Sequence, residues 1–224
     1  MELENLISFT FRWIHFFAGV TWIGLLYYFN FVQTEFFKET DAPTKSSAIA
    51  KLVPRALWWF RYGALFTFVS GLALAGFLGG AINFYLVVGM LLGTLMFLNV
   101  WLIIWPNQQI VIASTEQVIA GGEAIAEAAG ALGKAGLASR TNTLFSLPML
   151  FFMGASAHLT GVGRVPMSGA DGTSSLAMIL AIAIILGLQF NGMKGKTGPI
   201  TTVKGVIHCG VAMAAVLLLI IEFL

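Results

Sequence analysis

The stretch LISFTFRWIHFFAGVTWIGLLYYFNFVQ, residues 6–33, is long and apolar enough to predict a membrane-spanning helix. Within it, Arg12 and His15 lie three residues apart, and Gly19 and Trp22 continue the same helical face. Ionisable side chains at membrane depth are unfavourable and usually face protein or a water-filled cavity. We therefore expect this face to carry the function. In the alternative interpretation, Arg12 reaches the nearer membrane surface and His15 is a hydrogen-bonded packing residue.

The composition of the whole chain also predicts a membrane protein. Of its 224 residues, 58% are hydrophobic and 10% are charged, and the mean hydropathy is +0.88. The one cysteine, Cys209, allows neither a disulfide within the chain nor a Cys-x-x-Cys-His haem-attachment motif. The first apolar run has an acidic start and no small-residue cleavage site, so we expect it to be retained. The net charge of +2 does not indicate a nucleic-acid partner.

Six apolar stretches of about 20 residues predict an all-α fold, a polytopic helical membrane bundle that forms one integral domain over residues 1–224. The expected spans are residues 6–33, 57–79, 84–105, 143–161, 174–191 and 204–223. Pro106 is expected to end the third span. Basic residues gather after the first, third and fifth spans. The positive-inside rule therefore places these loops in the cytoplasm and both termini outside, in a bacterial inner membrane.

The long connection between the expected third and fourth spans, residues 107–139, has the pattern of an amphipathic helix. Glu116, Glu123 and Glu127 are spaced seven and four residues apart, which places them on one helical face. Apolar residues line another face, so we expect this helix to lie on the cytoplasmic membrane surface or against the bundle. The Gly121-Gly122 pair is expected to bend it.

The three histidines are candidate ligands for a haem or a metal ion. His15 and His158 are both expected in the outer half of the bilayer, whereas His208 starts the last span from the cytoplasmic side. Haem b between two bundle helices needs neutral imidazoles that face each other at one depth, so His15 with His158 is the favoured pair. Arg12 can pair with a haem propionate or an anionic substrate, and Trp22 can provide an aromatic wall. His208 is the competing ligand, and for each histidine packing or an interfacial position is the alternative.

Three other chemistries are poorly supported by the sequence. Cysteines and histidines are too few and too widely spaced for a structural zinc site. The acidic residues near the outer ends of the spans are expected at the surface, which disfavours a Ser-His-Asp arrangement. The glycine-rich stretches lie in helices or turns and not between a strand and a helix, so they do not indicate nucleotide binding.

Three stretches resemble the membrane domain of bacterial urate hydroxylase. They are RWIH at 12–15 with AGVTWIG at 18–24, NVW with WPNQ within 99–108, and RTNTLFSLPMLFFM at 140–153. The resemblance covers most of the chain to about Thr160 and is looser afterwards. More distantly, the chain resembles membrane-embedded protoporphyrinogen oxidases and copper-resistance membrane proteins, in which a first-helix histidine is associated with haem or metal.

The resemblance to urate hydroxylase implies a specific activity and partner. In that family a multi-span domain precedes a cytochrome c domain, and the whole protein is implicated in oxidising urate to 5-hydroxyisourate, with electrons leaving through the haem. The present sequence ends at Leu224 without such a domain. A separate cytochrome c is therefore the partner that the resemblance implies.

The leading hypothesis is a membrane redox module that binds haem b through His15 and His158 and passes electrons to an external carrier. The alternative is a non-catalytic integral subunit that packs with other membrane subunits in a respiratory or other energy-converting complex. A small-solute transporter is a third hypothesis, but evident internal repeats and paired intramembrane acids, which would favour it, are missing from the sequence.

Overall fold

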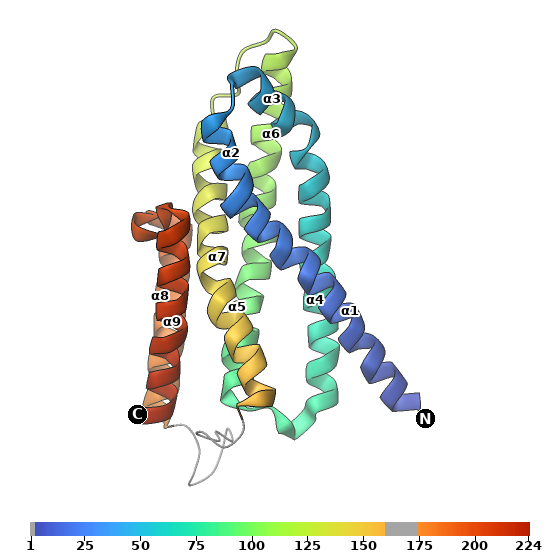
Figure 1. Cartoon of the computed structure of the whole chain (residues 1–224), viewed down its shortest axis with the longest axis vertical. Helices are drawn as coiled ribbons and strands as arrows, with labels where there is room; N and C mark the ends of the chain where they lie inside the picture. The colour runs from blue at the N-terminus through green and yellow to red at the C-terminus, as the bar shows by residue number, and fades with distance from the viewer. Residues whose placement is uncertain (1–2, 160–173) are drawn as a thin grey trace. The chain divides into compact units, whose positions relative to one another are not determined.

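The computed structural model describes residues 3–159 and 174–224, and these residues form helices joined by short turns. Their bounds are α1 (Leu3–Tyr27), η1 (Tyr28–Gln33), α2 (Thr34–Glu39), α3 (Ala42–Lys51), α4 (Val53–Leu78), η2 (Gly79–Ala81), α5 (Phe84–Asn99), η3 (Val100–Ile104), α6 (Trp105–Ile119), α7 (Ala128–His158), α8 (Ser175–Lys194), η4 (Gly198–Thr201) and α9 (Val203–Phe223) (Figure 1). The segments η1 and η3 are π-helical, whereas η2 and η4 are 3₁₀ turns. The predicted all-α fold is confirmed.

Five helical stretches in the described residues are long and apolar enough to cross a membrane, which is compatible with an integral membrane protein. They are Leu3–Glu39, Val53–Leu78, Phe84–Ile119, Ser175–Lys194 and Val203–Phe223. Five of the six predicted spans coincide with them. The remaining predicted span, 143–161, falls on α7, and its last two residues lie outside the described ranges. Asn142, Thr143 and Ser146 lower the hydropathy of α7, and all three are fully buried.

Pro106 does not end the third helical run, which corrects the expectation from the sequence. The run continues from α5 through η3 into α6, with Pro106 in the first turn of α6. Proline lacks an N–H, and in a regular helix its ring clashes with the carbonyl four residues earlier, here that of Leu102. The wider π-helical turn of η3 lies at this position and accommodates the proline.

A single amphipathic helix over residues 107–139 does not form. The chain turns between α6 and α7 at Gly121, whose φ of 88° is in the left-handed region that favours glycine. Ser114 of α6 accepts a hydrogen bond from the Ile125 N–H at 3.0 Å, which ties the turn to α6. The predicted charged face is thereby interrupted, because Glu123 lies in the turn and not on a helix.

The contacts between helices divide the chain into two compact units. Unit 1 comprises Met1–Gly71 and Phe97–Ser139, and unit 2 comprises Leu72–Met96 and Arg140–Leu224. Within unit 1, α1 approaches α4 at Gly63, where a Cβ would lie 3.1 Å from the Trp22 backbone nitrogen and 3.3 Å from the Ala18 carbonyl oxygen. The missing side chain at Gly63 therefore allows the two backbones to pack closely. A single integral domain stays a prediction.

Within unit 2, α7 packs against neighbouring helices at three glycines. The contacts are Gly89 of α5 with Met153, Gly192 of α8 with Thr141, and Gly210 of α9 with Leu147. Asn142 of α7 also donates a hydrogen bond from Nδ2 to the Met96 carbonyl at 2.9 Å. Helices α8 and α9 lie side by side (Figure 1). The polar face of α7 is thus used for helix packing, which the sequence alone does not reveal.

We predict that Gly192→Ala destabilises the protein by about 1–3 kcal/mol, because its Cβ would lie 2.6 Å from Thr141 Oγ1 and 2.9 Å from Thr141 Cβ. Gly187→Ala on the same helix is the matched control, since a Cβ at Gly187 meets nothing within 4 Å. That control should be neutral or stabilising by up to about 1 kcal/mol. Denaturant unfolding in detergent measures both, and equal stabilities would contradict the packing of α7 against α8.

The start of α3 depends on the charge of Asp41. Its Oδ1 accepts a hydrogen bond from the Thr44 N–H at 3.0 Å. Hydrogen bonding from Thr44, chiefly from its side chain and then from its backbone, holds the pKa of Asp41 below its usual range. A lowered folded-state pKa means that the stabilisation is present above the ordinary carboxyl pKa and is lost as the pH falls through the lowered value.

We predict that the Asp41 carboxylate titrates below the ordinary pKa of aspartate and that α3 frays from its first turn on acidification. A ¹³C NMR titration of Asp41 measures the midpoint, and the Thr44 amide shift reports the cap. Asp41→Asn is the control, because asparagine retains an accepting oxygen and does not titrate. An Asp41 midpoint at or above the ordinary value would contradict this prediction.

Candidate functional site

His15 is held by α4 within unit 1. Its Nδ1 lies 3.1 Å from Ser70 Oγ, and that hydroxyl oxygen lies 2.6 Å from the carbonyl oxygen of Phe66. A serine hydroxyl has one proton to donate. When that proton goes to the Phe66 carbonyl, Ser70 Oγ accepts from the Nδ1–H of His15. The ring nitrogen that carries the lone pair is then Nε2.

The backbone of α4 leaves room for the imidazole ring. A Cβ at Gly71 would lie 3.1 Å from His15 Cε1, so any other residue at this position would press on the ring. The ring is half-buried, and within the described residues the hydrogen bond whose ring nitrogen is resolved joins Nδ1 to Ser70. In this tautomer one nitrogen is fixed while the other carries the lone pair, which is the arrangement found in histidines that bind metals.

Arg12 and Trp22 flank His15 on α1 in different surroundings. Arg12 is exposed, and over residues 3–159 and 174–224 it has neither a hydrogen bond nor an ion pair. Trp22 is only 2% exposed and packs beside Gly63 of α4. Its Nε1 is buried without a hydrogen-bond partner in the described part of the chain. Arg12 is thus accessible to an anionic group, whereas Trp22 belongs to the contact between α1 and α4.

His158 lies in unit 2 and is the exposed last residue of α7. Two hydrogen bonds mark this end of the unit. Asn83 donates from Nδ2 to the Ser156 carbonyl at 2.9 Å, and the Tyr85 hydroxyl donates to the Glu222 carboxylate. His158 is therefore near the end of unit 2 at which α5 begins and α9 finishes. His15 and His158 belong to different units, and their pairing stays a prediction.

His208 is exposed on the first turns of α9, far from His158 along unit 2. The nearby Gly210 faces Leu147 of α7. At 1.5 Å of rise per residue, Leu147 lies roughly 16 Å before His158 along α7. The described structure thus separates these two histidines, and it does not bring them into one site.

The described residues contain no group of three or more His, Cys, Asp and Glu side chains that is arranged to hold a metal ion. A haem needs only one or two axial ligands, so this result bears on multidentate metal centres alone.

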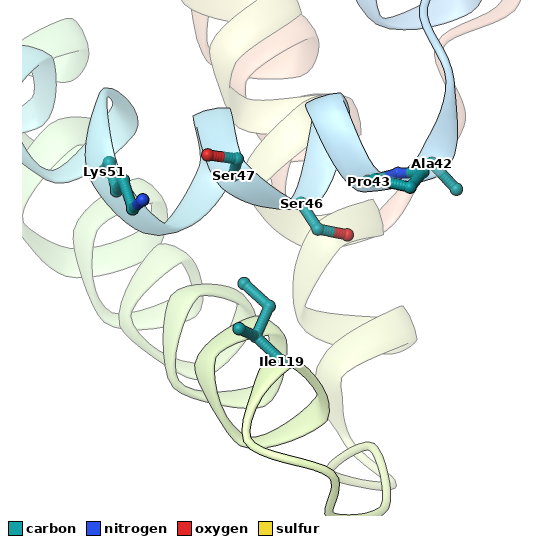
Figure 2. A pocket seen from close by; sticks show the side chains of 6 residues that line it. All are labelled: Ala42, Pro43, Ser46, Ser47, Lys51 and Ile119. Carbon is teal, nitrogen blue, oxygen red and sulfur yellow. The ribbon is translucent and has the colours of Figure 1, made fainter.

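The surface also has a groove of about 420 Å³ between α3 and α6. Figure 2 shows Ile119 of α6 pointing toward α3, where Ser46, Ser47 and Lys51 line the groove. None of the predicted ligands lies in it.

Ser70 was not predicted as a site residue. A serine in an apolar helix often donates or accepts a hydrogen bond between helices, and the Ser70-Gly71 pair combines such a group with a small residue. That local pattern could have identified the position. It could not have identified His15 as the partner, because the two residues are 55 positions apart.

The chain is similar to a known protein family. A family model described as urate oxidase N-terminal matches residues 77–219, nearly two thirds of the chain. The match contains the stretches at 99–108 and 140–153, whereas 12–24 precedes it. It also continues well beyond Thr160, farther than the sequence resemblance was expected to extend. Neither a curated protein nor a solved structure matches the chain.

We predict that Ser70→Ala releases the His15 ring. In the wild type, ¹⁵N NMR of labelled histidine should show a protonated Nδ1 and an unprotonated Nε2 for neutral His15. In Ser70→Ala this preference should be lost, with a destabilisation of about 1 kcal/mol from the missing hydrogen bond. Thr21→Ala is the control, because the Thr21 hydroxyl donates its proton to the Phe17 carbonyl of its own helix. An unchanged His15 tautomer in Ser70→Ala would contradict the assignment.

Proposed function

The chain belongs to the urate oxidase N-terminal family, and on that premise we propose that it is a membrane-embedded redox module that binds haem b. The observation that carries this proposal is the His15 imidazole, with Nδ1 held by Ser70 and the lone pair thereby on Nε2. A neutral imidazole of this kind suits an axial haem ligand, because the hydrogen bond at Nδ1 orients the ring and raises the basicity of Nε2.

The residues around His15 fit a haem group. Arg12 is exposed, carries a charge and lies about one helical turn from His15, so it can bind a propionate. Gly71 leaves the space that the imidazole occupies. When bound, haem b supplies a one-electron carrier. The chain supplies an oriented ligand at His15, a counter-charge at Arg12 and an apolar setting that affects the reduction potential. His158 stays the second ligand that the sequence predicts.

We propose that this module serves a reaction linked to urate oxidation and that electrons leave to a separate cytochrome c. Family membership supports the link to urate, because the family is described by the urate oxidase N-terminus. The proposed location is a bacterial inner membrane with both termini on the outer side, as the distribution of basic residues indicates. In this topology His15 and the external carrier are on the same side of the membrane.

The test is a reduced-minus-oxidised absorption spectrum of the gently purified full chain. The wild type should show a haem b signal, and His15→Ala should lose it. His208→Ala should retain the signal, because the competing ligand is not used. If haem is present, urate should reduce added cytochrome c in the wild type and not in His15→Ala. A wild-type protein that holds no haem after purification and reconstitution would overturn the proposal.

A non-catalytic subunit of a larger membrane complex is the second candidate, and the exposure of the first helical stretch favours it. Only 17% of the apolar window of Leu3–Glu39 is buried, against 22–39% for the other four candidate spans. An apolar face that is little covered by its own chain can contact lipid or another subunit. Stoichiometric co-purification with other membrane subunits, together with a His15→Ala variant that changes neither spectrum nor turnover, would favour this second function.

A further inference from the structure

We propose that Arg61 of α4, together with Trp101 of η3 and Trp105 of α6, forms a binding site for an oxyanion, the carboxylate or phosphate group of a ligand. All three residues belong to unit 1. The site does not involve His15 or Arg12, so it is independent of the proposed haem. It also goes beyond the family description, which names no residue.

The guanidinium of Arg61 is held among aromatic rings. Its Cζ lies 3.8 Å from the ring centroid of Trp105, 5.1 Å from that of Tyr62 and 5.8 Å from that of Trp101. A cation over an indole face is attracted by the ring quadrupole, which favours this position of the guanidinium. Such a guanidinium presents its planar fork of N–H donors in a fixed direction, and this fork matches the two oxygens of an oxyanion.

Two buried donors in this cluster have no acceptor. Arg61 Nε and Trp101 Nε1 are both enclosed, and neither has a hydrogen-bond partner in the described ranges. Arg61 forms no ion pair with a carboxylate of the residues that the structure describes. The terminal amino groups of Arg61 are not among the enclosed unpartnered atoms, and the side chain is half-buried. An anion can therefore reach them.

The backbone around Arg61 also departs from regular helix. Trp101 lies in the π-helical turn η3, and Phe60, the residue before Arg61, contacts Phe29 of the other π-helical turn, η1, with a centroid distance of 5.5 Å. Two π-helical turns thus border the same turn of α4. Such turns occur frequently at functional sites, because they redirect side chains that a regular helix would place elsewhere.

The alternative is an interfacial arginine that simply reaches toward the membrane surface among belt tryptophans. Arg55, six residues earlier on α4, is an example of such an arginine. It is exposed and has no cation–π contact with the rings of the described chain. Arg61 differs in having its cation fixed over Trp105 and its Nε enclosed. Arg55 therefore provides a matched control of the same residue type on the same helix.

The carboxylate or phosphate group that binds Arg61 can belong to a lipid or to a soluble molecule. For the lipid source, the probe is phosphatidylglycerol, counted by native mass spectrometry on the full chain in detergent, with phosphatidylcholine as the reference lipid. For the soluble source, the probes are inorganic phosphate and benzoate, titrated against the tryptophan fluorescence of the full chain. The wild type should bind at least one probe.

Arg61→Gln should weaken binding of that probe by about tenfold or more, since a charge-assisted contact is lost. Arg55→Gln should bind as the wild type does. Arg61→Lys keeps the charge and loses the planar fork, so it should bind with an intermediate affinity. Trp101→Phe keeps a ring and removes the Nε1 donor, and it should weaken binding by severalfold. These last two variants preserve the test if Arg61→Gln does not fold.

Binding of phosphatidylglycerol alone would identify the ligand group as a lipid phosphate. Binding of phosphate or benzoate would identify a soluble oxyanion. Either result supports the site, provided that it depends on Arg61. A wild type that binds none of the probes would overturn the proposal. So would equal affinities in the wild type and the Arg61 variants, or an equal loss in Arg55→Gln.

Discussion

Close approach of helix backbones at glycine is the constraint on which the packing of each unit depends. In unit 1, Gly63 brings α4 against the backbone of α1, and Gly71 two turns later leaves space for the His15 ring. In unit 2, Gly192 and Gly210 bring α8 and α9 against α7. Lipid does not drive apolar helices together as water does, so contacts of this kind and hydrogen bonds between helices determine which faces meet.

The same packing separates the polar side chains of the apolar spans into different roles. Asn142 uses its amide to bind the Met96 carbonyl and is fully buried, so it serves the contact between α7 and α5. His15 uses Nδ1 to bind Ser70, and in the proposed tautomer Nε2 carries the lone pair. Arg61 is fixed by aromatic rings without a counter-ion in the described residues. The groups with unused bonding capacity are the ones to which function is assigned.

The π-helical turns show how local chemistry changes a membrane helix. Pro106 explains η3 through its missing N–H and the steric demand of its ring. In η1, Asn30 donates from Nδ2 to the Leu26 carbonyl at 2.9 Å and to Ser139 Oγ at 2.8 Å. A side chain that bonds the carbonyl of the preceding turn competes with the regular backbone pattern, and the helix widens there. Both turns belong to unit 1, which also holds His15 and Arg61.

The sequence by itself determined the helical class, five of the spans and the family, because long apolar runs and linear motifs need no knowledge of contacts. It also drew attention to His15, since a histidine in such a run stands out. The tertiary structure alone decided that Ser70 orients this histidine, that Arg61 lies over Trp105, and that the helix passes through Pro106. The first two depend on contacts between helices that are far apart in the sequence. The third depends on the π-helical turn that accommodates the proline. Periodicity records which face of a helix a residue occupies, but not which residue lies opposite it.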